Sequence, residues 1–354
     1  MPKTVSAAQL DSLYRRVAAH HGADDEEAAT LAAALLRADL RGHTTQGIAL
    51  LPYVDELLTN GEMAFGRPLE IVRETAATAL LDGHRGVGHV IGTRAMEIAM
   101  EKARAVGIGF VTVRGSSDYA MASTYVLPAV EAGFIGVSMS TGPIIVAPWG
   151  GRDARFCTNP IALGVPAGER APIVIDMATS AYSMGAVVRA ARDGLLLDTP
   201  GVVDGDGRYT TDPASVILDV MDRESRMSGA LTTAGPKGFG WVLLVEILAA
   251  LLSGERTWED ERPATSTERP AHYGQTFIAI DVASFQDPEA FTAATDRMID
   301  TLTGARPAAG FDRIRVHGGT AAAEERRRRE AGVPVRDEEW EMVEHLAERL
   351  GISA

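Results

Sequence analysis

The chain has 354 residues, of which 46% are hydrophobic and 23% charged, a composition typical of a globular protein with a large core. Its formal net charge of −14 speaks against a nucleic-acid partner, because phosphate binding requires clustered Lys and Arg. The N-terminus lacks an apolar run of signal-peptide length, and a single cysteine excludes an intrachain disulfide. The longest apolar stretch is too short to span a bilayer. Together these features predict a cytoplasmic chain without a membrane partner.

The first sixty residues have the spacing of amphipathic helices, and alternating strands and helices follow from about residue 75. We expect early helices over 6–20, 24–42 and 47–60. We predict strands at 77–82, 109–114, 136–141, 171–177 and 277–281, and helices between them at 94–105, 120–132 and 239–252, the last one buried. Three more helices are expected at 287–303, 320–331 and 337–350.

This order predicts an α/β (α+β) fold, with helices from both termini packed together as one lobe. The helical lobe would comprise residues 1–74 and 318–354, and the α/β core residues 75–317. We interpret 253–273 as a surface loop, because Thr, Ser and Pro alternate there with charges. The basic run 326–329 follows two glutamates in a helix, so we interpret it as a solvated helix face.

A glycine-rich turn at residues 86–92 leaves one alternative fold open. The turn follows a strand and opens a helix, as the phosphate loop of a Rossmann domain does, and Arg114 would then be placed to meet a 2′-phosphate. However, a long helical region precedes it, and its spacing is G-x-G-x-x-x-G rather than the tighter form. A Rossmann-type NADP reductase is therefore the second choice.

Four segments are hard to explain as generic structure. They are V-A-P-W-G-G-R-D-A-R-F-C-T-N-P-I-A-L-G-V-P at 146–166, I-V-I-D-M-A-T-S-A at 173–181, G-P-K-G-F-G-W at 235–241 and R-G-H-T-T-Q-G at 41–47. The first is a rigid loop with little side-chain bulk, of the kind that brings backbone donors close to a ligand. The lone Cys157 within it has small or apolar neighbours, which favours a buried structural thiol.

Two of these segments carry charged groups with a chemical purpose. Asp176 ends a fully apolar strand, and a carboxylate in that place is costly unless it is paired or used. Lys237 lies between two glycines where a helix begins, so its ammonium and the free backbone N–H groups of the helix start favour an anionic ligand.

Together the four segments resemble the malate/L-lactate dehydrogenase-like family, which includes ureidoglycolate, sulfolactate and diketogulonate dehydrogenases and piperidine-carboxylate reductases. The resemblance runs from about residue 5 to residue 350 and includes D-G-H-R-G-V-G-H, R-G-S-S-D-Y and R-I-R-V-H-G-G. It implies a non-Rossmann fold with a mixed-sheet core, a homodimer with its active site near the subunit contact, and NADH or NADPH as cofactor. Carried over by position, it implies a set of cofactor-binding residues: Ser140, Thr141, Pro143, Thr158, Asn159, Asp176, Met177, Ala178, Thr179 and Lys237. For Met177 and Ala178, turn or core packing is the strongest alternative.

The sequence departs from the family on the substrate side. Thr44-Thr45-Gln46-Gly47 stands where the family has D-S-H-G, so Gln46 replaces a histidine that is a candidate for proton transfer. Asp118 replaces the histidine of N-S-N-H-F-G, and Leu50 and Tyr53 occupy the places of an arginine that would hold a substrate carboxylate. A glutamine cannot donate and recover a proton as imidazole does.

Three accounts of this departure stay open. In the first, the enzyme reduces an altered carbonyl or imine substrate, not simple malate or lactate. The residues around the proton transfer would then come from the set Asp118, Gln46, Thr45, His43, Tyr119 and Asp176. In the second, the chain has lost redox chemistry and keeps the fold for another reaction or for binding. In the third, it is an ordinary dehydrogenase whose acid lies elsewhere, with His43 and His89 available. We favour the first account, because the cofactor-side segments are intact.

Overall fold

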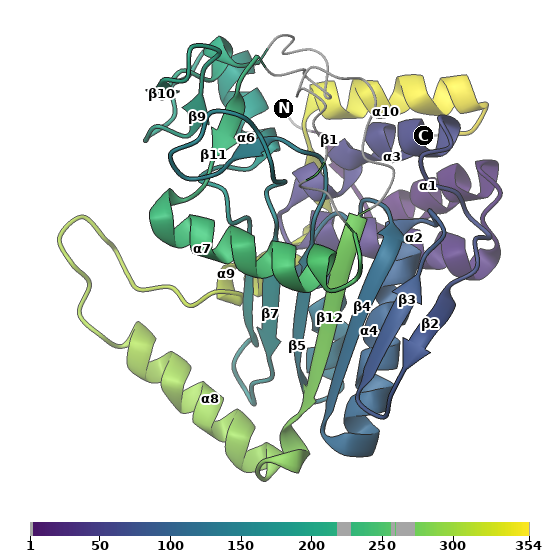
Figure 1. Cartoon of the computed structure of the whole chain (residues 1–354), viewed down its shortest axis with the longest axis vertical. Coiled ribbons are helices and arrows are strands. Elements are labelled where there is room, and N and C mark those ends of the chain that lie inside the picture. The colour runs from purple at the N-terminus through teal and green to yellow at the C-terminus, as the bar shows by residue number, and fades with distance from the viewer. Residues whose placement is uncertain (1–2, 218–227, 256–258, 260–272, 354) are drawn as a thin grey trace.

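The computed structural model describes residues 3–217, 228–255, 259 and 273–353, in which a large sheet, a small sheet and a helical lobe are joined (Figure 1). The strands are β1 Lys3–Val5, β2 Glu70–Glu74, β3 Thr78–Asp82, β4 Ile108–Ser116, β5 Phe134–Ser140, β6 Val146–Ala147, β7 Ile161–Val165, β8 Ile173–Met177, β9 Val202–Val203, β10 Tyr209–Thr210, β11 Ala230–Thr232, β12 Tyr273–Asp281 and β13 Val333–Val335. The α-helices are α1 Ala7–His20, α2 Asp25–Leu40, α3 Leu51–Thr59, α4 Gly88–Val106, α5 Ser123–Glu131, α6 Met184–Arg192, α7 Gly235–Val245, α8 Pro288–Thr303, α9 Gly319–Ala331 and α10 Asp337–Leu350. Short turns are η1 Thr44–Gln46, η2 Ile48–Leu50, η3 Pro213–Ser215 and η6 Val282–Ser284, which are 3-10, and η4 Glu246–Leu251, which is π-helical.

The seven-stranded sheet has the order β2-β3-β4-β12-β5-β7-β8. Within the described residues, β3 and β4 form its one parallel pair, and every other neighbouring pair is antiparallel. A Rossmann domain requires a mostly parallel sheet, so that alternative is wrong and the mixed sheet is confirmed. Arg114 forms an ion pair with Asp82, at 2.9 Å from Nε to Oδ2. Residues 86–92 turn the chain from β3 into α4.

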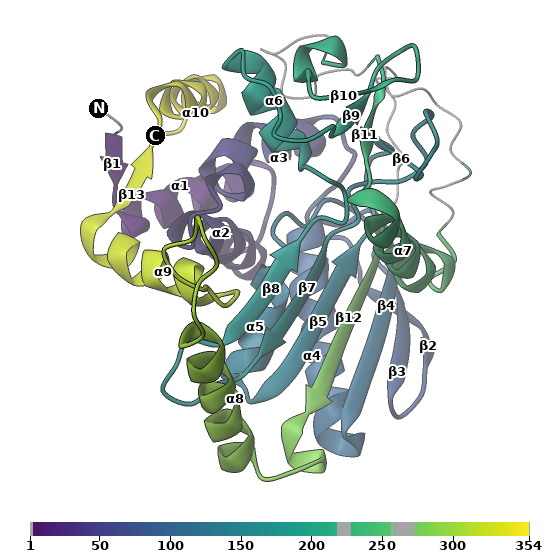
Figure 2. The ribbon, with the colours of Figure 1, turned by 90° about the vertical axis from the view of Figure 1, so that its left-hand side faces the viewer.

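Helices cover both faces of this sheet (Figure 2). Helices α4 and α5 pack on one face, where the apolar core includes Ala99, Val111 and Phe277. Helix α7 and the η4 turn lie across the other face, where Val245 and Ala249 pack on Met139 of β5. Two helices begin elsewhere than expected, because the glycine turn leads directly into α4 at Gly88 and α5 starts only at Ser123.

The predicted burial of residues 239–252 is wrong. The helix does form, as α7 followed by η4, but Trp241, Leu243 and a row on η4 are exposed. A helix that lies across a sheet buries only the stripe that touches the strands. A continuous apolar run in a sequence does not reveal whether the side of the helix that faces away from the sheet is covered by other parts of the chain. The predicted loop at 253–273 falls almost wholly outside the described residues.

The two ends of the chain meet in the helical lobe. Strand β1 pairs antiparallel with β13, and α10 packs against α1 and α3 around a core that includes Leu10, Leu35 and Trp340. The predicted helices at the N-terminus and the three at the C-terminus are confirmed within a few residues. The interpretation of residues 326–329 as a solvated face fails at Arg328, which is buried and donates from Nη1 to the backbone oxygen of Asp39 at 2.7 Å.

A second, smaller sheet has the order β10-β9-β11-β6 and carries α6 (Figure 2). Its core includes Val146, Val187, Val202 and Leu231. The parallel pairing of β11 with β6 places the start of α7 close to the loop that follows β6. This sheet therefore positions the lysine-bearing end of α7.

Candidate active site

One edge of the large sheet collects most of the candidate residues. Strands β4 and β5 both pair antiparallel with β12, so they run in the same direction and end at the same edge. Strand β8 ends there too, because it is antiparallel to β7, which is antiparallel to β5. Residues 117–118, 140–141 and 176–179 are therefore brought to one edge, which faces the helical lobe and the small sheet (Figure 1).

Asp176 lies at the start of helix α5. Its Oδ2 accepts the backbone N–H of Ser123 at 2.7 Å, and the positive end of the helix favours the carboxylate. Burial nevertheless raises the pKa of Asp176 above its ordinary value, while Ser123 and the positive charges of His43 and Arg41 work in the opposite direction. The carboxyl group is thus held in place by one fixed donor and remains able to take a proton.

His43 is the electrostatic partner of Asp176. It immediately precedes η1, and its backbone N–H donates to the oxygen of Ala38 at 2.8 Å. Partial desolvation of the ring lowers the pKa of His43, although the residue keeps substantial exposure, and the charge of Asp176 opposes that shift. The pKa of the acid is raised and the pKa of the base is lowered, so the two pKa values approach each other and either group can hold a proton shared by the pair.

Asp118 and Tyr119 lie beside this pair. Oδ1 of Asp118 accepts the N–H of Ala120 at 2.8 Å, and the ring of Tyr119 stacks on Tyr125 with centroids 4.7 Å apart. Burial raises the pKa of Tyr119 far above its usual value, and the charges of Asp176 and Asp118 raise it further. Tyr119 is therefore a neutral phenol throughout the physiological pH range.

Thr45 and Gln46 lie half-buried in η1. A Cβ added to Gly185 would meet the side chain of Thr45 at 3.8 Å, so η1 faces the first turn of α6. The backbone N–H of Gln46 donates to the oxygen of His43 at 2.8 Å. The two candidates are therefore on the same short turn as His43.

The segments assigned to the cofactor converge at the start of α7. Thr179 donates from its backbone N–H to the oxygen of Thr158 at 2.9 Å and from its hydroxyl to the oxygen of Asn159 at 3.1 Å. The backbone oxygen of Thr179 in turn accepts the N–H of Ala234 at 3.2 Å. Lys237 is exposed in the first turn of α7, so its ammonium is accessible beside these backbone groups.

Asn159 is the most constrained member of this set. It is fully buried with a φ of 39°, and its Nδ2 donates to Oε2 of Glu246 at 2.8 Å and to the oxygen of Val242 at 3.2 Å. Its Oδ1 is buried without a hydrogen-bond partner among the described residues. An unused buried acceptor is costly, so this atom fits a site at which a ligand donates a hydrogen bond.

The remaining candidates differ in what they expose. Ser140 and Thr141 are buried and their hydroxyls are used internally, Ser140 donating to the oxygen of Thr141 at 2.7 Å and Thr141 accepting the N–H of Gly274 at 3.0 Å. Pro143 and Ala178 are half-buried. Met177 is 42% exposed, so the alternative of core packing is wrong for this residue.

Other predictions made from the sequence have clear outcomes. Cys157 is buried, and burial raises the pKa of its thiol to about 11, so the interpretation as a structural thiol is confirmed. Leu50, at one of the places of the family's arginine, is buried. Arg41 forms an ion pair with Glu325, with its Nη1 2.9 Å from Oε2. Ser123 and Asp39 were missed, although an aspartate on the apolar side of a predicted helix is a signal for a buried polar contact.

These features are those of an α/β protein in which His43 of the lobe and Asp176 of the sheet edge affect each other's pKa, near a helix start that carries an exposed lysine. A model of the malate/L-lactate dehydrogenase family matches residues 5–344. Malate dehydrogenase of Pyrococcus abyssi is 35% identical over 345 residues, which are 97% of this chain and 94% of that protein. The Delta(1)-pyrroline-2-carboxylate/Delta(1)-piperideine-2-carboxylate reductase of Pseudomonas syringae pv. tomato is also 35% identical, over 286 residues, 79% of each chain.

The structural comparison agrees. The structure of malate dehydrogenase from Pyrococcus horikoshii superimposes with a TM-score of 0.87 at 30% identity, covering 100% of this chain and 97% of that one. The chain therefore belongs to the malate/L-lactate dehydrogenase family, and it is an oxidoreductase. Dehydrogenases of this family use nicotinamide cofactors. Within the described parts of the chain, no helix is both long and apolar enough to cross a membrane.

Proposed function

We propose that this oxidoreductase transfers a hydride to or from a carbonyl or imine substrate other than malate or lactate, and that the His43–Asp176 pair handles the proton. The observation that carries the proposal is the mutual effect of these two side chains on each other's pKa. It supplies an acid–base pair near the positions where Gln46 and Asp118 stand in place of the family's histidines.

The chemistry explains why the pair matters. The nicotinamide, when bound, supplies the hydride. Reduction of a carbonyl leaves an alkoxide that must receive a proton, whereas an imine can arrive protonated and leave as a neutral amine. A pair that holds one proton can meet either need. The equal identity to a malate dehydrogenase and to a cyclic-imine reductase favours neither substrate class.

The cofactor would lie along the start of α7. Lys237 and the N–H groups of that helix would attract its phosphates, and the unused Oδ1 of Asn159 would accept a hydrogen bond from it. NADH and NADPH both remain candidates. Arg114, whose Nε pairs with Asp82, adds no support for a 2′-phosphate site.

A cofactor and substrate screen tests this proposal. Thermal shift with NADH and NADPH would be followed by absorbance at 340 nm with 2-oxo acids and with cyclic imines. We expect at least one nucleotide to raise the melting temperature, and an imine or a bulkier carbonyl compound to be turned over. Binding without oxidation of any substrate would favour a non-redox member of the fold, and ordinary rates with pyruvate or oxaloacetate would contradict an altered substrate.

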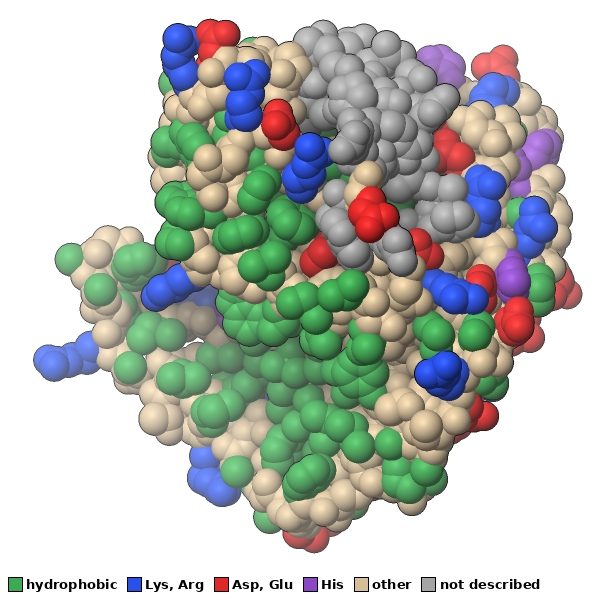
Figure 3. All heavy atoms as spheres, in the orientation of Figure 1, with side chains coloured by type: hydrophobic (Ala, Val, Ile, Leu, Met, Phe, Trp, Pro, Cys, Tyr) green, Lys and Arg blue, Asp and Glu red, His purple; other side chains and the backbone are tan. Residues whose placement is uncertain are grey.

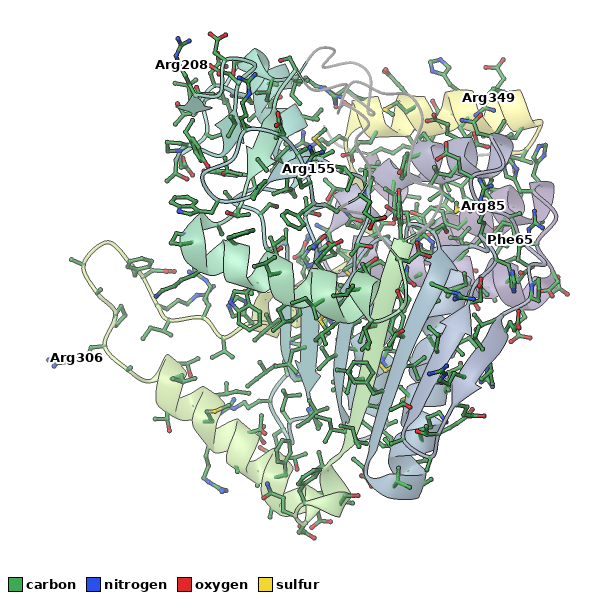
Figure 4. The ribbon with its side chains drawn as sticks, viewed as in Figure 1. Phe65, Arg85, Arg155, Arg208, Arg306 and Arg349 are labelled. Atoms are coloured by element: carbon green, nitrogen blue, oxygen red, sulfur yellow. The ribbon has the colours of Figure 1, made fainter. Side chains whose placement is uncertain are left out.

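We also propose that the enzyme is a cytoplasmic homodimer, with its active site near the subunit contact. Apolar side chains gather over α7 and the strands beside it (Figure 3), and exposed members are Ile247 and Leu251 on η4 and Leu252 directly after it. Residues 300–313, which comprise the last turn of α8 and the segment after it, are exposed throughout, and Arg306 points away from the molecule (Figure 4). A second copy that covers the η4 face would remove this apolar surface from water.

A further inference from the structure

Asp39 is a fully buried carboxylate with no role in the chemistry described above. It lies in the last turn of α2, four residues before His43 in the sequence. Its oxygens accept the backbone N–H of Ile48 at 3.0 and 3.2 Å, and Oδ2 accepts the hydroxyl of Tyr14. A buried carboxylate is unfavourable unless donors surround it, so these contacts define a specific anchor.

The Asp39 carboxylate holds the C-terminal end of the turn that carries His43. Residues 43–47 begin with the hydrogen bond from His43 to Ala38 and end at Gly47, whose backbone lies directly on the Asp39 carboxylate. A Cβ added to Gly47 would lie 2.2 Å from Oδ1 of Asp39. The turn is therefore fixed to α2 at both ends, by a backbone bond before His43 and by the carboxylate after Gln46.

Several elements converge on this anchor. Tyr14 comes from α1, and Arg328 of α9 holds the backbone oxygen of Asp39. The charge of Arg328 lowers the pKa of Asp39, and Glu339 of α10 raises it. Burial is the largest influence and raises that pKa to about 7. The anchor thus connects the helices of the terminal lobe to the turn that faces Asp176.

We propose that Asp39 is a positioning residue, whose buried carboxylate fixes the 43–48 turn and so keeps His43 within electrostatic reach of Asp176. The inference rests on the proposed function of the His43–Asp176 pair. Asp39 lies beneath the turn and acts through Ile48 and Gly47. Small displacements of a proton-transfer group cost large factors in rate, so a firm anchor has a direct catalytic value.

The test compares Asp39→Asn with a matched variant, Asp55→Asn. Asp55 is also a buried carboxylate of the helical lobe, but it accepts from His21 at 2.8 Å and from Arg349, which projects from α10 (Figure 4). Each variant would be compared with the wild type in kcat, in KM and in the pKa of His43. The NMR signal of His43 would be assigned with His43→Gln. Tyr14→Phe, which keeps the ring and removes one donor to Asp39, is the milder version if Asp39→Asn folds poorly.

We expect Asp39→Asn to lower kcat by about ten- to a hundredfold with little change in cofactor affinity, and to move the pKa of His43 toward its ordinary value. Tyr14→Phe should do the same to a smaller degree, and Asp55→Asn should leave both quantities unchanged. The proposal is wrong if kcat and the pKa of His43 stay at wild-type values in Asp39→Asn, or if Asp55→Asn changes them equally. If the wild type turns over no substrate, the proposed function fails, and the pKa of His43 alone still decides whether Asp39 positions it.

Discussion

Asp39 and Asp176 are both carboxyl groups whose pKa is raised by burial, but their surroundings differ. Asp39 is enclosed by a phenol and a backbone N–H and has no exposed surface. Asp176 is half-buried and is influenced by the ring of His43. Asp39 therefore acts on structure, whereas Asp176 is placed for proton transfer.

The first prediction concerns stability and pH. The pKa of Asp39 is about 7 in the folded protein and about 4 when unfolded, so the folded state holds an extra proton between these values. Its contribution to the free energy of unfolding is complete below about pH 4 and is lost as pH rises to 7. Asp39→Asn cannot ionise, so the loss of unfolding free energy that Asp39 causes between pH 4 and 7, roughly 1–3 kcal/mol, should be absent from the variant. An unchanged pH dependence in calorimetry would contradict it.

A second prediction separates the two aspartates of the site. Asp118→Asn keeps an oxygen for the N–H of Ala120, so the loop should stay in place. Because the His43–Asp176 pair is the proposed proton donor, we expect kcat within about threefold of wild type and an unchanged pH profile. Steady-state rates across pH measure this. A lost pH limb in Asp118→Asn would assign the acid to Asp118 instead.

At the scale of elements, the start of α7 is the part most closely tied to the cofactor. Lys237→Ala removes the exposed ammonium of its first turn and leaves the backbone N–H groups. A charge-assisted contact to a phosphate is worth about 1.4 kcal/mol or more, so the dissociation constant of the nicotinamide cofactor should rise at least about tenfold. Fluorescence titration measures this, with Arg208→Ala on the small sheet as control. Equal affinities for wild type and Lys237→Ala would place the phosphates elsewhere.

Sequence patterns predicted helices and strands well where the spacing of apolar residues fitted only one of the two. The three C-terminal helices and the strands at 109–114 and 277–281 were found because their apolar spacing had one interpretation. The pattern failed where burial depended on distant neighbours. Arg328 belongs to a basic run, yet it is buried because its side chain donates to the backbone oxygen of Asp39 on α2. The encounter of His43 with Asp176, from segments more than a hundred residues apart, has no local signal at all.

At the scale of the whole molecule, the η4 face leads to a prediction about assembly. Ile247 and Leu251 are 50% and 56% exposed in the single chain. Aspartate at either position would put a charge into the proposed dimer contact, so Ile247→Asp should shift the protein from dimer to monomer in light scattering at micromolar concentration. Leu195→Asp is the matched control, because Leu195 is 59% exposed on the small-sheet side. A monomeric wild type, or a dimeric Ile247→Asp, would contradict this contact.

Of the residues that depart from the family pattern, Gln46 lies in a turn of the terminal lobe, whereas Asp118 lies at the sheet edge with the cofactor segments. The cofactor segments belong to the sheet edge and α7, whereas His43, Thr45 and Gln46 belong to a turn of the terminal lobe. The two groups are attached to different cores, one built around Phe277 and one around Leu35. Substitutions in the turn therefore leave the strands and α7 undisturbed.

The proton-transfer role of the His43–Asp176 pair is measured most directly by the pH profile of kcat for His43→Gln, with His21→Gln as control, since His21 pairs with the buried Asp55 of α3. The last proton of the pair can be held by either group, so removing the ring leaves Asp176 alone to hold it. We expect kcat for reduction to fall by about a hundredfold or more and the alkaline limb to move to lower pH. Wild-type kcat and an unmoved limb in His43→Gln would show that the pair does not handle the proton.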